Sequence, residues 1–93
     1  MDIRFRDDAL SRLEVEADDG GYPPGIAKAF RKRMQTLRAA TDERVLRQWK
    51  SLHFEKWEDH HSVRLNEQWR LILDFEGDSS SKVVVILGIK DYH

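Results

Sequence analysis

The sequence contains no cysteine and only two prolines, and no stretch of it is long and apolar enough to span a membrane. Without cysteine the chain has neither disulfides nor thiolate metal ligands, so its 93 residues must build a core from packing alone. The first residues, "MDIRFRDDAL", lack the basic-then-apolar pattern of a signal peptide. The sequence therefore predicts a single soluble domain, residues 1–93, located in the cytoplasm with no membrane partner.

An excess of charge of one sign is also absent. Sixteen basic residues are balanced by 17 acidic ones, so total charge does not predict strong non-specific binding to nucleic acid. The charges are nevertheless unevenly distributed, because the segment from Lys28 to Lys50 is mostly basic and residues 6–19 carry an excess of acids. We therefore expect a basic side and an acidic side.

Apolar residues at helical spacing predict the helices. The first begins at a cap formed by Asp7 or Asp8 and ends before "DDGGYPPG", whose glycines and prolines make it a connection within the domain. The second follows Pro24 and has one apolar face, made by Ile26, Phe30, Met34 and Leu37. A third, short helix starts from Thr41 as its cap, with inward side chains at Val45, Leu46 and Trp49.

From Ser62 onward the apolar residues alternate instead, which is typical of strands. "SVRLN" and "WRLILDFE" each have one apolar face, which for the second strand places Trp69 in the core, and "KVVVILGI" is expected to be buried on both faces and central in its sheet. "DIRFR" alternates in the same way. The expected fold class is α+β: one compact domain with an N-terminal strand and two to three helices packed on a mainly antiparallel sheet of about four strands.

The loop between the first two of these strands can be deduced from parity. A two-residue loop would place charge on the core face, whereas a three-residue loop over 66–68 pairs Leu65 with Trp69. The three-residue loop also places Arg64 directly opposite Arg70 on the other face of the sheet. Two like charges in that position repel, so we expect either that carboxylates such as Asp74 neutralise them or that they face a phosphate.

Two further groups of residues invite a functional interpretation. His60 and His61 lie among acidic residues, but neighbouring residues cannot easily share a metal ion in a strand or a helix, so a solvated loop is expected rather than a metal site. Trp57 has no apolar neighbours in sequence. We expect it to be partly exposed, either at a protein interface or stacked on a base.

The last residues, "KDYH", combine proton donors and acceptors directly after the most hydrophobic strand. Cleavage of RNA by attack of its own 2′-OH needs a base for that hydroxyl, an acid for the departing 5′-oxygen, and fixed positive charge for the phosphorane. By composition alone, such a tail is most often just solvated. Residues of the required types are His93, Asp91, Tyr92, Lys56, Arg64 and Arg70.

The order of these residues resembles that of the HigB-type toxins of the RelE/ParE superfamily. In that family a Leu-His-Pro-Leu-Lys-Gly-like segment leads into a Ser-x-Arg-x-Asn strand, a Trp-Arg-Leu-Ile strand follows, and the chain ends in Asp-Tyr-His. The matching stretches here are "LHFEK", "SVRLN", "QWRLILDFE" and "DYH". The resemblance is close over about half the chain, and the "IRFRD" opening with its basic helix fits the remainder loosely.

The resemblance implies a RelE-like toxin of a type II toxin–antitoxin system: a ribosome-dependent mRNA endonuclease that cuts translated messages in the ribosomal A site without a metal or other cofactor. It implies a helix-turn-helix, HigA-type antitoxin as partner, and contact with operator DNA only through that antitoxin. Carried over residue by residue, it implies proton transfer by His93 and Asp91, substrate binding by Tyr92, and stabilisation of phosphate charge by Arg70 and Lys56. Arg64 joins them as a substrate-binding residue from the parity argument.

The chain departs from the family pattern in one segment. The family's Pro-Leu-Lys-Gly is replaced by Phe54, Glu55, Lys56 and Trp57, so the loop that presents Lys56 loses its proline and its glycine. The basic helix is either a solvated face or a contact to ribosomal RNA, which the chain's slightly acidic balance does not decide. The candidate ribosome-binding residues are Lys28, Arg31, Lys32 and Arg38.

Two alternatives to the nuclease remain open. A ParE-like relative would inhibit DNA gyrase by binding, and a catalytically degenerate member would act only in a repressor complex with its antitoxin on operator DNA. Fold does not separate these from the nuclease. The terminal Asp-Tyr-His favours the nuclease, because a protein that only binds has no need of a proton-transfer group there.

Overall fold

The computed structural model describes residues 1–78 and 81–91. The predicted site residues Tyr92 and His93 therefore lie outside the described residues. In chain order the elements are β1 (Asp2–Phe5), α1 (Asp8–Val15), α2 (Ile26–Ala39), α3 (Glu43–Gln48), a 3-10 turn (Lys50–Leu52), β2 (Glu55–Trp57), β3 (His60–Arg64), β4 (Trp69–Glu76) and β5 (Val83–Asp91).

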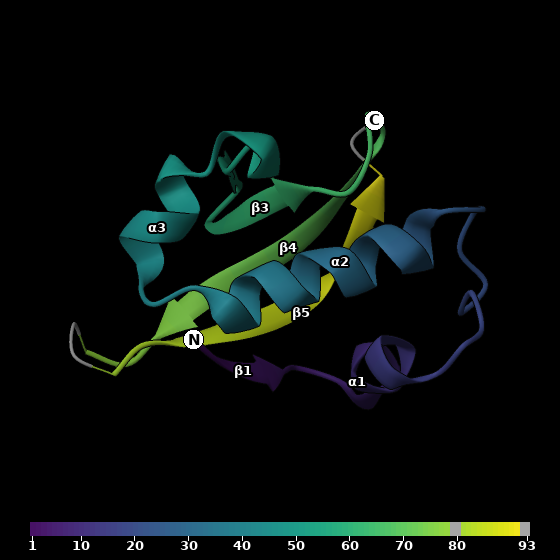
Figure 1. Ribbon diagram of the computed structural model, residues 1–93, viewed down its shortest axis with the longest axis horizontal. Coiled ribbons are helices and arrows are strands. Elements are labelled where there is room, and N and C mark those ends of the chain that lie inside the picture. The colour runs from purple at the N-terminus through teal and green to yellow at the C-terminus, as the bar shows by residue number, and fades with distance from the viewer. Residues whose placement is uncertain (79–80, 92–93) are drawn as a thin grey trace.

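The strands form a single sheet in the order β1-β5-β4-β3-β2, in which β1 runs parallel to β5 and all other neighbours are antiparallel. The helices lie on one face of this sheet, with α2 running across it (Figure 1). The predicted α+β class is confirmed, as is the interior position of the 82–89 strand. The sheet has one strand more than the four expected, because β2 is three residues long and too short to show alternation.

The core lies between the helices and the sheet face that they cover. The predicted apolar stripe of α2 is buried along its whole length. Each such side chain contributes about 1.5–3 kcal/mol by leaving water. The stripe is part of one apolar cluster with the inward side chains of three strands, which include Val63, Leu71, Leu73, Val84 and Ile86.

The helix starts were predicted well, with one correction. Asp7 caps α1, accepting a hydrogen bond from the backbone N–H of Ala9 at 3.1 Å. The cap of α3 is Asp42 and not Thr41, because the Asp42 carboxylate accepts from the N–H of Val45 at 3.1 Å. A carboxylate at this position also opposes the positive end of the helix dipole, which a hydroxyl cannot do.

The prediction that Trp49 fills the core is wrong. α3 ends at Gln48, and Trp49 follows in an extended conformation that takes it off the inward face of the helix, so it is 44% exposed. Trp69 does pack against the core, where its ring meets Tyr22 edge to face with a centroid distance of 6.0 Å. Trp57 is partly exposed, as expected.

The parity argument for the loop at 66–68 is confirmed. Val63 pairs with Leu71 and Arg64 with Arg70, and the N–H of Leu65 donates to the carbonyl of Trp69 at 2.9 Å. The Asn66 side chain holds the turn, because its oxygen accepts from two backbone N–H groups beyond it, at 2.8 and 2.7 Å.

His60 and His61 do not lie in a loop as predicted, because a two-residue turn joins β2 to β3 and draws both into the sheet. Adjacent strand residues point to opposite faces. Nδ1 of His60 lies 2.5 Å from Oδ2 of Asp74, on the face that the helices leave uncovered. His61 packs on the helix side against Phe54 and Phe75, where burial and the nearby Arg47 guanidinium lower its pKa.

Candidate active site

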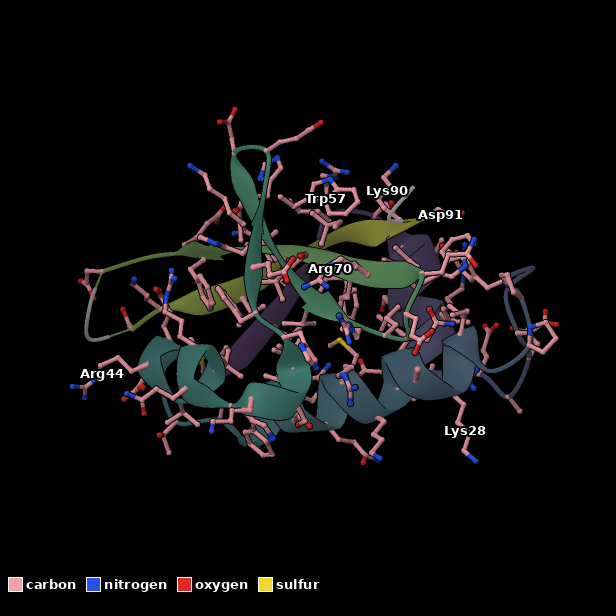
Figure 2. All side chains as sticks on the ribbon, turned by 90° about the horizontal axis from the view of Figure 1, so that it is seen from above. Lys28, Arg44, Trp57, Arg70, Lys90 and Asp91 are labelled. Atoms are coloured by element: carbon pink, nitrogen blue, oxygen red, sulfur yellow. The ribbon has the colours of Figure 1, made fainter. Side chains whose placement is uncertain are left out.

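Three cationic side chains lie side by side across the sheet face opposite the helices, which we call the open face. Arg64 on β3 is directly opposite Arg70 on β4, and Arg70 is directly opposite Lys90 on β5. Directly opposed residues have Cβ atoms about 4.5–5.5 Å apart, so these charges repel one another unless an anion lies between them. We call Arg64, Arg70 and Lys90 the cationic row. Figure 2 shows Lys90 on the side of the sheet away from the helices.

Arg70 is the fixed centre of the row, because only 3% of it is exposed. Its Nε donates to Oγ of Ser62 at 2.7 Å, and its Nη2 donates to the carbonyl oxygens of His53 and Ser62. The Glu55 carboxylate lies 3.8 Å from the same Nη2. A buried guanidinium held in this way keeps its orientation without help from a ligand.

The backbone just before β2 provides a hydrogen-bond acceptor for Arg70. The 3-10 turn ends at His53, which adopts the left-handed conformation with φ of 46° and so turns its carbonyl toward the guanidinium. The imidazole Nε2 of His53 also lies 3.5 Å from Nη1 of Arg64. His53, Glu55 and Ser62 therefore surround the row, although their residue types and positions in the sequence did not point to the site. Glu55 is brought there by the pairing of β2 with β3, and the sequence showed no strand signal for β2.

Lys56 is not part of this arrangement. It pairs with His61, whose ring faces the helix side, whereas Glu55 and Trp57 on either side of it belong to the open face. The structure thus brings together Arg70 and Arg64 among the predicted phosphate-binding residues and places Lys56 on the other side of the hairpin. Lys90, which was not among the predicted site residues, completes the row instead.

Asp91 lies at the end of β5, next to Lys90 and opposite Trp69. Its carboxylate accepts a hydrogen bond from the amide of Gln68 at 2.9 Å. Asp91 is exposed, and it follows the row directly in the chain. Tyr92 and His93, the other predicted members of the terminal group, lie outside the described residues.

The basic helix α2 covers the side of the molecule opposite the row, as the labelled Lys28 and Arg70 show (Figure 2). Two of the four predicted ribosome-binding residues already have partners within the chain. Arg31 donates to the carbonyl oxygens of Leu13, Glu16 and Asp18, and Arg38 makes two hydrogen bonds of 2.8 Å to the carboxylate of Glu14. Lys28 and Lys32 are exposed.

Among residues 1–78 and 81–91, no three His, Cys, Asp or Glu side chains are arranged to hold a metal ion. Within the same residues, no helix has the length and apolar character needed to span a membrane. What the described site offers is fixed positive charge on the open face of the sheet, with the Glu55 carboxylate beside it. Such a site is suited to binding a phosphate group and moving protons near it.

The fold is similar to that of a solved toxin structure. A solved structure described as "YoeB/ParE toxin from Agrobacterium tumefaciens" is similar to this chain with a TM-score of 0.56, at 12% sequence identity and over 100% of both chains. At that identity the similarity establishes the fold alone. No curated protein sequence matches the chain.

The sequence profile of the family described as "RelE-like toxin of type II toxin-antitoxin system HigB" matches residues 3–93. The chain therefore belongs to this family of HigB-like toxins, which confirms the resemblance drawn from its motifs. Membership of a toxin–antitoxin family implies an antitoxin as partner.

Proposed function

We propose that this protein is a ribosome-dependent mRNA endonuclease that arrests translation and growth. The observation that carries the proposal is the cationic row on the open face of the sheet. The Glu55 carboxylate, 3.8 Å from Arg70, offsets part of the repulsion between the members of the row, and an anion bound at the row during function would offset more of it. The scissile phosphate of RNA is such an anion.

In this proposal the row stabilises the negative charge of the phosphorane formed when the 2′-OH attacks. Arg70 is suited to the central role, because its guanidinium is held by Ser62 and the carbonyl of His53 before any substrate arrives. Preorganised charge of this kind needs no rearrangement during the reaction. Arg64 and Lys90 lie on either side of Arg70 and orient two further oxygens of the same phosphate.

The proton-transfer roles go to the last residues of the chain. We assign His93 and Asp91 to proton transfer and Tyr92 to substrate binding, as the family motif implies. The Glu55 carboxylate, 3.8 Å from Arg70, is a further proton acceptor on the same face. Lys56 has no role here, because its side of the β2–β3 hairpin faces away from the row.

The partners in this proposal are a helix-turn-helix antitoxin of the HigA type, through which alone the protein contacts operator DNA, and the ribosome with mRNA in its A site. The exposed side chains of Lys28 and Lys32 are the candidates for contact with ribosomal RNA, on the side of the molecule away from the row. Arg31 and Arg38 are less suited, because they already bind groups of the chain itself. The site of action is the cytoplasm.

The test is induced expression of the wild type and of a His93→Ala variant in a bacterial host, with mapping of mRNA 5′ ends after growth arrest. We expect new ends at fixed positions within codons of translated messages, and their loss in the variant. His61→Phe is the matched control, because it removes a histidine on the helix side and leaves the open face unchanged.

Other outcomes would reject the proposal or one of its residue roles. Growth arrest with intact messages and inhibited supercoiling would assign the protein to the gyrase inhibitors. No arrest at all, from protein that still binds its antitoxin, would assign it to repressor complexes. Cleavage that persists in His93→Ala at the wild-type rate would leave the nuclease in place and remove His93 from it.

A further inference from the structure

A hollow of about 200 Å³ lies on the open face beside the cationic row. Its apolar lining residues are Trp57, Ile72 and Leu87, and its polar lining residues are Arg6, Glu58, His60 and Lys90. Lys90 therefore belongs to both the hollow and the row. The labelled Trp57 and Lys90 lie near each other on the side of the sheet away from the helices (Figure 2).

The floor is apolar because of an irregularity in the sheet. The register between β4 and β5 shifts between Ile72 and Leu73, so Leu87 becomes an extra residue on β5. Ile72, Val85 and Leu87 then form a small apolar cluster on the open face, separate from the main core, and the indole of Trp57 packs against it. The result is an apolar surface next to three positive charges.

Gly88 contributes to the lining of the hollow without a side chain. Its φ is not in the positive range that favours glycine, and a Cβ added there would meet one atom within 4 Å, Cε of Lys90 at 4.0 Å. The backbone therefore does not require glycine, although glycine within a strand costs about 0.5–1 kcal/mol relative to alanine. Glycine in a strand interior often marks the close approach of a ligand.

The distance between the hollow and the row suits a nucleotide. Gly88 and Lys90 are two residues apart on β5, which is about 6.6 Å along the strand. One nucleotide can span that distance, with its phosphate at the row and its base over Gly88. An indole wall, an apolar floor and adjacent positive charge are the features with which proteins bind single-stranded nucleic acid.

We propose that the hollow is a subsite for a nucleobase adjacent to the phosphate held by the row, with Trp57 as its stacking wall. The inference rests on the proposed function, since it names the part of the RNA that this site takes. Purines are preferred over pyrimidines, because the larger ring system covers more of the indole.

The polar rim adds hydrogen-bonding groups. Nδ1 of His60 lies 2.5 Å from the Asp74 carboxylate, so Nε2 is the ring nitrogen that can contact a base. Lys90 supplies a donor in the same lining. These groups can bind the edge of a base while the indole covers its face.

Binding can be measured without any cleavage, by titrating the ¹⁵N-labelled full chain with a purine nucleoside 5′-monophosphate and separately with inorganic phosphate. We expect the nucleotide to shift the indole N–H signal of Trp57 and the amides of Ile72 and Gly88, and inorganic phosphate to shift the row and leave these signals in place. The nucleotide should also bind more tightly than phosphate.

Two variants test the hollow by different means. Gly88→Leu fills it, and Trp57→Leu removes its stacking wall; each should weaken nucleotide binding by about 5- to 100-fold and leave phosphate binding within about twofold. The matched controls are Val83→Leu, at the other end of β5, and Trp49→Leu, which removes an exposed indole next to α3. Both should bind the nucleotide as the wild type does.

Equal affinity for nucleotide and phosphate, or unchanged nucleotide affinity in a folded Gly88→Leu or Trp57→Leu variant, would overturn the subsite. That result leaves the nuclease proposal standing if messages are still cut. If the wild type cuts no message and yet binds the nucleotide through Trp57, the proposed function fails and the base subsite remains.

Discussion

The two faces of the sheet are built from the same strands and have opposite properties. On β4, Leu71 points into the core with the helices, and its neighbour Arg70 points to the open face. The helix side consists of interlocking apolar side chains, whereas the open face combines a row of like charges with one small apolar cluster. One face stabilises the fold, and the other carries groups that the fold alone does not need.

This difference shows how a strand of eight residues can serve both purposes. Alternation assigns every second residue to each face, so changes on one face leave the other in register. Arg70 is the exception, since it is as buried as the core residues and depends on polar partners instead of apolar ones. Mutations on the two faces should therefore affect stability and activity separately, except around Arg70.

The largest effect on stability is expected on the helix side. Leu71→Ala removes a side chain that is fully buried between α2 and the sheet, and should lower the free energy of unfolding by about 2–5 kcal/mol. Denaturant unfolding measures this directly. The protein that remains folded should keep its phosphate affinity; a loss of affinity beyond the unfolded fraction would show that the two faces are coupled.

Ser62→Ala tests the surroundings of Arg70, the buried exception on the open face. Oγ of Ser62 is fully buried on the open face and accepts the Nε hydrogen of Arg70 at 2.7 Å. Losing this charge-assisted bond should destabilise the protein by about 1.5–3 kcal/mol. Cleavage should fall as well, because Arg70 loses a group that orients it. Ser62→Thr, which keeps the hydroxyl, is the control, and a stability equal to that of Ser62→Ala would argue against the hydrogen bond.

Lys90→Gln should separate stability from activity most clearly. Lys90 is exposed, so the change should alter stability by no more than about 0.5 kcal/mol, and the relief of repulsion from Arg70 favours a small gain. Message cleavage should fall by about 10- to 100-fold, as expected when one charge near a phosphorane is removed. Arg44→Gln, on the far side of the molecule (Figure 2), is the matched loss of charge and should cleave normally. Equal cleavage by both variants would exclude Lys90 from the site.

The smallest effect is expected in the pH dependence of stability, through His61 on the helix side. The pKa of His61 is lowered in the folded protein, mainly by burial, so the unfolded chain binds a proton at higher pH than the folded one. The stability that depends on neutral His61 is complete above the unfolded pKa and is lost as the pH falls from that value toward the folded pKa. In His61→Phe, which keeps an aromatic ring beside Phe54 and Phe75, the melting temperature should decrease less between neutral pH and pH 5. An unchanged decrease would assign the acid sensitivity to other groups.

Much of the fold could be predicted because its signals are local. The stripe of α2, the cap at Asp7 and the alternation of β4 each depend on residues a few positions apart. The errors fell where an element was too short to show a period or where a helix ended earlier than its apolar pattern suggested. Thus β2 was missed, and Trp49 was wrongly placed in the core.

For the candidate site, too, some residues could be placed from the sequence and others could not. Parity across a three-residue loop was enough to set Arg64 opposite Arg70, because loop length and apolar alternation leave one consistent register. Lys90 could not be added by that reasoning, since the bulge at Leu87 and the longer β4–β5 turn make its register indeterminate from sequence.

The sequence by itself determined the α+β class, the apolar stripe of α2, the pairing of Arg64 with Arg70 and the motifs that identify the family, because each of these depends on the order and spacing of nearby residues. Only the tertiary structure decided that Lys90 completes the row, that Lys56 faces away from it and that Trp57 closes a hollow over Ile72 and Leu87. Those outcomes depend on how strands distant in sequence pair and shift against one another, and no local pattern of residues specifies that register.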